Sequence, residues 1–404
     1  MESIAEERRE GNSFEESYVR ELWKEVRDDF WGDLKVETQR ALKRLLETGL
    51  EVEVQDLIGT RHWEHKRERI GYRNGYYNRG LLTGFGYLED LRVPRIREGG
   101  IRFKSIRRYR QRSEEIDKMV KEMFLQGVGT RKVKEVLEPI VGKNALSSTT
   151  VSRITKELDR EVMKFHNRRL RDEYKYLILD GIYLNAKSVV YKKRRCVLVC
   201  YGIKEGGQKE LIDFYLTKKG ESEEGWEYFL NRLYHRGLEG KELKLVCIDG
   251  NKGLYNAVRN IYPEAKVQRC WVHKLKNVAN KCPRRIEEEV IRGARKIYSA
   301  TDKRGALEAY VEWDRKWREV VPKAVECLED DLEELLTFYE EPEEWRKKLR
   351  TTNIIERVFR EVRRRTRPMG CFQNRESVER IIFAIFNRQN KIWENSREKI
   401  TQNP

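Results

Sequence analysis

Two aspartates stand in matching positions and could share one kind of chemistry. Asp180 ends an apolar run over residues 176–180, Asp249 ends a largely apolar run over 243–249, and each is followed by glycine. A carboxylate at the end of a buried strand is held rigidly at the edge of the sheet, which is where α/β sheets form ligand sites. Two such carboxylates repel each other unless a cation lies between them.

The aspartate pair indicates a site for metal-dependent phosphoryl transfer. That chemistry uses hard oxygen ligands and two divalent ions, Mg²⁺ or Mn²⁺, roughly 3.5–4 Å apart. In the alternative interpretation each Asp-Gly pair is only a turn that closes a strand. One pair alone would favour the turn, whereas two pairs after strands of matching type favour the metal site.

A third acidic ligand is needed, and Glu356 is the candidate. It lies in the first turn of a helix predicted over about 354–366, after the polar cluster Thr351-Thr352-Asn353. Arginines on successive turns of this helix are suited to contact phosphates: Arg360, Arg363, Arg364 and Arg367. Alternatively, Glu356 only offsets the helix dipole and its arginine neighbours. Spacing alone does not separate Glu356 from Glu361.

The elements around the aspartates have a recognisable order. Strands are expected at about 176–180, 196–202, 211–216, 243–249 and 265–268, with a helix at about 222–236 and another between the last two strands. The order β-β-β-α-β-α-β is the outline of an α/β RNase H-like core. Residues 270–349 are predicted to be almost entirely helical and charged.

The N-terminal part is predicted to be mainly helical. Residues 1 to about 55 show helical spacing of apolar residues, and residues 71–80 are turn-rich, aromatic and basic. Two short strand-like runs follow at 81–83 and 88–93. Residues 114–158 are predicted to be helical again. The third helix of this region, at about 149–168, carries Arg153 and Lys156 behind a Ser-Ser-Thr-Thr cap. This pattern indicates a helix-turn-helix, although a plain helical linker would give it too.

The charge of the chain favours a polyanionic partner. The 404 residues include 85 Lys and Arg against 68 Asp and Glu, a formal net charge of +17. Such an excess is typical of proteins that bind nucleic acid, and the alternative is a solvated surface. The basic stretch at 102–112 suits a phosphate backbone, or forms a solvated connection; its candidates are Arg107, Arg108, Arg110 and Arg112.

Cysteine usage and hydropathy predict a protein that stays in the cytoplasm with the nucleoid. The seven cysteines lie mostly in apolar runs, as reduced buried thiols do, and form no C-x-x-C pair. No signal core or apolar run of membrane-spanning length is present. The histidines His62, His65, His166 and His235 show no paired motif and are interpreted as incidental.

Over about residues 70–392 the sequence resembles the Mutator-like DDE transposases of bacterial and archaeal insertion sequences. The resemblance is carried by short motifs in a specific order: Tyr72-Arg73-Asn74-Gly75-Tyr76-Tyr77, Val93-Pro94-Arg95, Ser148-Thr149-Thr150-Val151-Ser152-Arg153-Ile154, Leu179-Asp180-Gly181-Ile182-Tyr183-Leu184, Arg236-Gly237-Leu238, Asp249-Gly250, Gln268-Arg269-Cys270-Trp271-Val272-His273, Asn277, Asn353-Ile354-Ile355-Glu356-Arg357 and Arg365-Thr366-Arg367.

The resemblance implies roles for individual residues. Asp180, Asp249 and Glu356 become the catalytic and metal-binding triad, and motif position then selects Glu356 over Glu361. Cys270 and His273 form the family's C-x2-H signature. A structural zinc would need further ligands, with Cys282 as a conceivable third, so packing or hydrogen bonding near the metal site is favoured. Trp271 is expected in the core, and the alternative is that it stacks on a base.

The function implied is cleavage at the ends of a mobile DNA element and joining of the freed 3′ ends to target DNA. The double-stranded DNA partners are the terminal inverted repeats and the target, held by a homodimer or larger assembly. Two rivals are an RNase H-like nuclease without strand transfer and an inactive DNA-binding regulator. The expected segments are a helical region 1–70, a basic β/turn segment 71–113, a helix-turn-helix domain 114–170, the first part of the core 171–269, an all-helical insertion 270–349 and C-terminal core helices 350–404.

Overall fold

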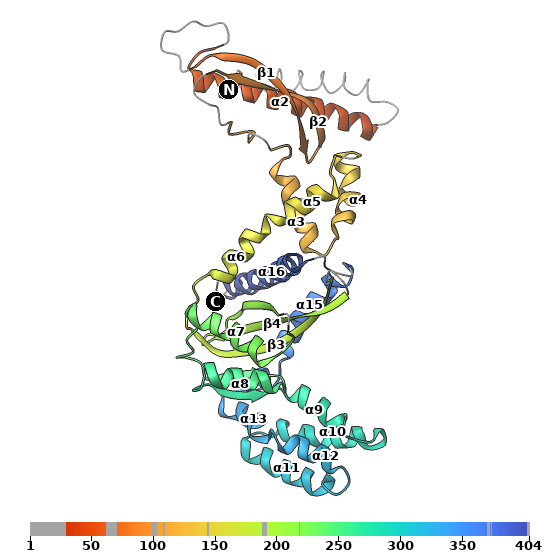
Figure 1. Ribbon diagram of the computed structural model, residues 1–404, viewed down its shortest axis with the longest axis vertical. Helices are drawn as coiled ribbons and strands as arrows, with labels where there is room; N and C mark the ends of the chain where they lie inside the picture. The colour runs from red at the N-terminus through yellow and green to blue at the C-terminus, as the bar shows by residue number, and fades with distance from the viewer. Residues whose placement is uncertain are drawn as a thin grey trace, which may run out of the picture. The chain divides into compact units, whose positions relative to one another are not determined.

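The computed structural model describes residues 30–61, 71–97, 103–107, 110–143, 145–187, 192–217, 219–369, 372 and 374–401. The chain divides into two compact units. The first comprises residues 1–123 and 130–155, and the second residues 124–129 and 156–404. The described parts of each unit are coloured along the chain in Figure 1.

The first unit joins a β-hairpin to helices. Helix α2 (Phe30–Ile58) packs on strand β2 (Gly86–Ile96), which pairs in antiparallel fashion with β1 (Arg73–Thr83). Leu50 of α2 is fully buried in a small core with Leu91 and Val93 of β2. Helices α3 (Glu114–Leu125), α4 (Thr130–Val141) and α5 (Ser148–Lys156) follow in sequence.

Strand β1 corrects the prediction of a turn-rich segment at 71–80. Tyr77 pairs with Val93 across the hairpin. The Arg92 guanidinium lies 4.5 Å from the centre of the Tyr76 ring, and that of Arg95 lies 5.0 Å from the Tyr77 ring. Aromatic and cationic cross-strand contacts of this kind stabilise a strand that contains glycine and asparagine.

The predicted third helix at about 149–168 is two helices, α5 and α6 (Leu158–Asn167). Ser147 caps the start of α5, because the Ser147 Oγ accepts a hydrogen bond from the Thr150 backbone N–H at 3.0 Å. Near the break, the Thr155 hydroxyl donates to the Ser152 carbonyl oxygen at 2.9 Å. Such local bonds compete with the helical hydrogen-bond ladder. The expected helix over residues 1–29 lies outside the described residues.

The second unit is built on a five-stranded mixed sheet in the order β5-β4-β3-β6-β7. Its strands are β3 (Tyr174–Lys187), β4 (Lys192–Lys204), β5 (Lys209–Thr217), β6 (Leu245–Ile248) and β7 (Lys266–Arg269). The first three form an antiparallel meander, and β6 and β7 continue the sheet parallel to β3. The order of strands and helices along this stretch agrees with the prediction.

Helices cover both faces of this sheet (Figure 1). On one face α7 (Glu223–His235) and α8 (Lys252–Ile261) bury Trp226 and Leu254 against Leu177 and Leu179 of β3. On the other face α15 (Asn353–Thr366) and α16 (Arg375–Thr401) bury residues such as Phe386. Because both faces are covered, β3 and β6 read as nearly continuous apolar runs.

Between β7 and α15 the described chain is helical, as predicted. The elements are α9 (Trp271–Ala279), α10 (Arg284–Ser299), α11 (Lys303–Trp317), α12 (Pro322–Glu329), α13 (Leu332–Leu336), the 3₁₀ turn η1 (Thr337–Glu340) and α14 (Glu343–Leu349). Trp313 and Trp317 of α11 lie in their common core with Ala294 of α10. This insertion therefore has apolar packing of its own.

Gly127 provides a test of the packing in the second unit. Its φ is +91°, and a Cβ atom placed there would lie 2.6 Å from the backbone oxygen of Arg365. We expect Gly127→Ala to lower the free energy of unfolding by about 1–3 kcal/mol, because both the backbone conformation and the contact oppose a side chain. Thermal unfolding measures this, at about 2–4 °C per kcal/mol.

Gly129→Ala is the matched control for this substitution. A Cβ atom at Gly129 would meet nothing within 4 Å, and its φ is not in the left-handed region. The melting temperature of this variant should stay at or above that of the wild type. Equal losses in the two variants would contradict the packing argument.

Candidate active site

The parallel pairing of β3 with β6 brings the two aspartates level with each other. Ile178 of β3 pairs with Cys247 of β6. Two residues further along each strand, Asp180 therefore stands opposite Asp249. Neighbouring strands are roughly 4.8 Å apart, so the two carboxyl groups belong to one site.

Asp180 does not end its strand, in contrast to the prediction. Strand β3 continues to Lys187 because β4 pairs with it along that whole length. Strand β6, by contrast, ends at Ile248, directly before Asp249. Asp180 thus lies at the point where β3 is no longer paired with β6 but is still paired with β4. Asp180 is only 6% exposed.

The Asp180 carboxyl group is under strong electrostatic strain. Burial, and then the charge of Asp249, raise the pKa of Asp180 to about 8. Glu221 adds to the shift, while His273 and the Gly181 backbone N–H oppose it. The N–H donates to Asp180 Oδ1 at 2.7 Å, which orients the carboxylate but does not neutralise it. Such a perturbed carboxyl is typical of functional sites.

Glu221 is a carboxylate of this site that the sequence analysis missed. It lies between β5 and the Ser222 cap of α7. A Cβ atom built on Gly181 would lie 2.4 Å from Glu221 Oε1, so the absence of a side chain at 181 leaves room for this carboxylate. Burial and the charge of Asp249 raise the pKa of Glu221. No motif surrounds it, and its only sequence signal is its place after a predicted strand and before a predicted helix.

The two ends of the helical insertion are joined beside the aspartates. Cys270, at the start of α9, accepts hydrogen bonds at Sγ from the Thr352 backbone N–H at 3.3 Å and from its hydroxyl at 3.4 Å. The Trp271 backbone N–H donates to the Arg350 carbonyl oxygen at 3.1 Å. These contacts, which we call the neck, fix the start of α15 against the start of α9.

The neck places His273 next to Glu356. Glu356 lies in the first turn of α15, and its Oε1 is 3.8 Å from His273 Nε2. The interaction with Cys270 raises the pKa of His273 to about 9; burial opposes this, and Asp180 and Asp249 add to it. Burial raises the pKa of the Cys270 thiol, but His273 and Thr352 outweigh burial and lower it. His273 Nδ1 has no well-directed hydrogen bond within the described structure, so its link to Cys270 is a close charge contact.

Geometry distinguishes Glu356 from Glu361, which spacing did not. Glu361 accepts hydrogen bonds from Arg364 at 3.0 Å and from Arg365, whose side chain is buried. It is therefore engaged in ion pairs on its own helix. Glu356 instead faces His273, which in turn neighbours both aspartates.

The donor set suits a hard divalent cation, because it consists of carboxylate oxygens with a charge that the protein does not balance. Over the described residues, however, no group of three or more His, Cys, Asp and Glu side chains is drawn close enough to hold a metal ion. Asp180, Asp249, Glu356 and Glu221 are the residues that would hold such ions.

Cys270 and Trp271 have structural partners. Trp271 is 1% exposed, and its Nε1–H donates to the Leu335 carbonyl oxygen at 2.7 Å, so its ring lies in the core and has no face open to a base. Cys282, the conceivable third zinc ligand, donates to the Val278 carbonyl oxygen at 3.3 Å. These contacts fit packing and hydrogen bonding.

The predicted phosphate-contacting residues fall into two groups. Six lie exposed on helices: Arg153 and Lys156 on α5, and Arg360, Arg363, Arg364 and Arg367 on or just after α15. The basic stretch is different. Asp117 binds both Arg110, at 2.6 Å, and Arg112. Arg107 is exposed beside Glu114, and Arg108 lies outside the described residues.

The structure is that of an α/β protein with an acidic pair at the carboxyl end of two parallel strands and a helix, α15, that follows an all-helical insertion. Residues 23–396 match the family profile "Transposase, Mutator family". The chain belongs to the Mutator family of transposases.

Characterised relatives support this assignment. The transposase for insertion sequence element ISRM5 of Rhizobium meliloti is 34% identical over 355 residues, which is 88% of each chain. The transposase for IS256 in transposon Tn4001 of Staphylococcus aureus is 32% identical over 85% of this chain and 87% of its own. Among solved structures, the Drosophila P element transposase strand transfer complex matches 72% of this chain and 80% of that one at 11% identity, with a TM-score of 0.30 that is too low to compare folds.

The helices of the protein are short or polar by the standard of a membrane span. Across the described residues, none combines the length and the apolar character that crossing a bilayer requires.

The strained Asp180 carboxyl predicts a stability gain on substitution. Folding raises the pKa of Asp180 from an ordinary value of 3.8 to about 8. Between these pH values the unfolded chain loses the Asp180 proton and the folded protein keeps it, so the free energy of unfolding falls as the pH rises from about 4 to about 8. We expect metal-free Asp180→Asn to melt at a higher temperature than the wild type, with a difference that is larger at pH 8 than at pH 5. Calorimetry at the two pH values measures it. A difference that shrinks as pH rises would contradict the raised pKa.

Proposed function

We propose that this chain is a DDE transposase that binds the terminal inverted repeats of an insertion sequence, cleaves the DNA and joins its 3′ ends to target DNA. The register that sets Asp180 level with Asp249 carries the proposal. The neck supports it, because it sets Glu356 beside His273, which interacts with both aspartates. Family membership supports the substrate class.

The catalytic unit is proposed to be an RNase H-like core with an all-helical insertion. The supporting observation is its sheet, in which an antiparallel meander of three strands is extended by two parallel strands in the order β5-β4-β3-β6-β7. The insertion between β7 and α15 leaves the sheet uninterrupted. Consequently the third carboxylate can come from a helix far along the chain.

Each residue of the site has a distinct proposed task. When bound, two Mg²⁺ or Mn²⁺ ions would activate the attacking oxygen and stabilise the leaving oxygen of the phosphodiester. Asp180 on β3 and Asp249 directly after β6 would hold them, and Glu356 would complete the set from α15. His273 keeps a positive charge at neutral pH because its pKa is raised, and it would restrain Glu356.

DNA recognition is proposed for the N-terminal part of the chain. Helices α4 and α5, joined by a short connection, would form a helix-turn-helix with α5 in the major groove. Exposed Arg153 and Lys156 on α5 support this role. Arg360, Arg363, Arg364 and Arg367 would contact phosphates near the cleavage site, and a homodimer or larger assembly would hold two ends together.

The main test is cleavage of a labelled terminal-repeat duplex in the presence of a target plasmid. With Mg²⁺ we expect nicked and joined products from the wild type, and none with EDTA. Asp180→Asn, Asp249→Asn and Glu356→Gln should each lower cleavage to below about a thousandth, because such residues act as a unit. Binding of the duplex should persist. Cleavage by Asp180→Asn, or nicking that never yields joined products, would refute the proposal.

Thermal unfolding in the presence of Mg²⁺ separates a loss of metal binding from a loss of catalysis. Saturating Mg²⁺ should raise the melting temperature of the wild type, because a ligand that binds only the folded state stabilises it by about 2.7 kcal/mol at 100 times its Kd. The melting temperature of Asp180→Asn should not respond. An equal response in the two proteins would place the ions elsewhere.

Glu221 yields a separate prediction about the size of the carboxylate set. Because it shares the charge environment of Asp180 and Asp249, we expect Glu221→Gln to reduce cleavage at least tenfold, about 1.4 kcal/mol, and to raise the Mg²⁺ concentration needed for half-maximal rate. Glu224→Gln is the control, since Glu224 is exposed in the first turn of α7 and its ion pair within the described residues is with Lys219. Equal rates for the two variants would remove Glu221 from the site.

A further inference from the structure

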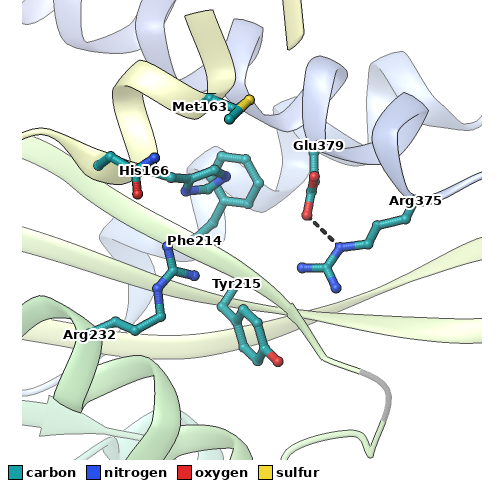
Figure 2. A pocket seen from close by; sticks show the side chains of 8 residues that line it. Met163, His166, Phe214, Tyr215, Arg232, Arg375 and Glu379 are labelled. Carbon is teal, nitrogen blue, oxygen red and sulfur yellow. Dashed lines mark hydrogen bonds and ion pairs between the residues drawn. The ribbon is translucent and has the colours of Figure 1, made fainter. Parts of the chain in front are cut away.

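A pocket of about 310 Å³ opens beside β5, the outer strand of the sheet, within the second unit (Figure 2). This volume is at the lower end of the roughly 300–1,000 Å³ that small-ligand sites occupy. Three helices and the strand contribute its walls, which include Met163 and His166 of α6, Tyr215 of β5, Arg232 of α7, and Arg375 and Glu379 of α16. It contains none of the four carboxylates of the candidate active site.

His166, interpreted as incidental from the sequence, lines this pocket and is held in place by a buried partner. Its Nδ1 lies 2.7 Å from Oδ1 of Asp213, a carboxylate that is 1% exposed. Asp213 is also bound by Arg236 and by the Phe214 backbone N–H at 2.8 Å. The buried carboxylate therefore holds the imidazole in one orientation, with Nε2 left for another partner.

The charges around the pocket leave one cation unbalanced. Arg375 donates to Glu379 at 2.7 Å, as the dashed line in Figure 2 shows, and these two charges cancel. Asp213 is balanced by Arg236 and His166. Arg232 forms no ion pair or hydrogen bond with any residue that the structure describes, and Figure 2 shows its guanidinium group between His166 and Tyr215. The pocket therefore favours an anion.

Aromatic side chains form the floor beside these cations. The Phe214 ring meets the His166 ring edge-on at 4.6 Å between centroids and is itself buried. Tyr215 is partly exposed, and the Arg375 guanidinium lies 5.8 Å from its ring centre. The partly exposed Tyr215 ring next to the unpaired Arg232 is suited to a nucleotide, whose base stacks and whose phosphate is charged.

The outer edge of β5 is unavailable to an additional strand. The Asn390 side chain accepts from the Leu211 backbone N–H at 2.8 Å and donates to its carbonyl oxygen at 3.1 Å. Arg168 donates to the Ile212 carbonyl oxygen at 2.6 Å. Side chains therefore occupy the groups that a docking peptide would need, which argues against strand addition as the use of this edge.

The pocket also lies on the same row of the sheet as the candidate active site. Phe214 pairs with Val199, and Val199 pairs with Asp180. Two strand spacings, roughly 10 Å, separate the backbones of Phe214 and Asp180. This row is covered by α15 and α16, so a DNA strand with its phosphodiester at Asp180 would pass around these helices to place a nucleotide in the pocket.

We propose that this pocket binds one unpaired nucleotide of the DNA substrate, with the phosphate on Arg232 and the base against Tyr215. A base within a duplex is stacked on its neighbours and cannot reach the aromatic floor, so the ligand is a nucleotide in a single-stranded or unstacked segment. This inference rests on the proposed function, because it assumes a DNA substrate at the acidic site.

The test compares a blunt terminal-repeat duplex with the same duplex carrying an unpaired 3′ thymidine overhang. Fluorescence anisotropy with the full chain gives both affinities. We expect the overhang to increase the affinity of the wild type, and Arg232→Gln and Tyr215→Leu to remove this gain, about tenfold for one charge-assisted contact. Arg259→Gln, which removes the same charge from an exposed position on neighbouring α8, should retain it.

Photocrosslinking tests the location of the nucleotide without any substitution in the protein. A photoreactive 4-thiothymidine in the overhang, irradiated with the wild-type protein, should attach to peptides that contain Tyr215 or Arg232. Attachment elsewhere, or an equal loss of affinity in Arg232→Gln and Arg259→Gln, overturns the proposal. So does binding of free thymidine 5′-monophosphate in the pocket without any gain from the overhang.

The outcomes also distinguish this inference from the proposed function. If the wild type cleaves the terminal-repeat duplex with Mg²⁺ but gains no affinity from the overhang, only the pocket assignment is overturned. If the wild type neither binds nor cleaves either duplex, both proposals are overturned.

Discussion

The neck between Cys270 and Thr352 is the constraint on which the acidic site depends. Asp180 and Asp249 come from paired strands, so the sheet itself sets their positions. Glu356 has no such support, because the whole helical insertion separates it from Asp249. The hydrogen bonds from Thr352 to the Cys270 sulfur close the insertion at its base and set the start of α15 beside α9. The helices of the insertion belong to the same apolar core as one face of the sheet, and the neck closes them without displacing the glutamate. The C-x2-H signature then has a physical role: the cysteine holds the helix, and the histidine faces the glutamate.

The same arrangement weakens the fold locally. Asp180 is almost completely buried beside another carboxylate, and among the described residues its Oδ1 accepts a hydrogen bond from the Gly181 backbone N–H. Burying charge without a balancing partner costs stability unless the group is neutralised by a proton or a cation. The covered sheet offsets this cost with strands buried on both faces. Rigid strands that carry strained carboxyl groups are what a preorganised site requires, since the ligands cannot relax away from each other.

Much of this arrangement could be predicted from the sequence, because it follows from periodic patterns. The apolar runs before Asp180 and Asp249 indicated the strands, and the charged helical stretch indicated the insertion. What could not be predicted depends on contacts between distant segments. Glu221 joins the aspartates only because Gly181 leaves room for it. The strand at 73–83 depends on arginines across the hairpin that lie over its tyrosines. Likewise, the link between His166 and Asp213 spans two elements that no motif connects.

The buried Asp213 shows how charge away from the acidic site can be organised by the same sheet. The side chain of Asp213 lies in the outer strand, where a carboxylate without partners would be costly, and Arg236 and His166 both reach it. Burial lowers the pKa of Arg236, the charge of Asp213 opposes this, and the nearby Arg168 and Arg232 repel it further. Positive charge therefore gathers around one buried carboxylate that is already matched. Because Arg168 is paired with Glu210, the charge left over is that of Arg232, which is turned into the pocket and placed to receive an anion.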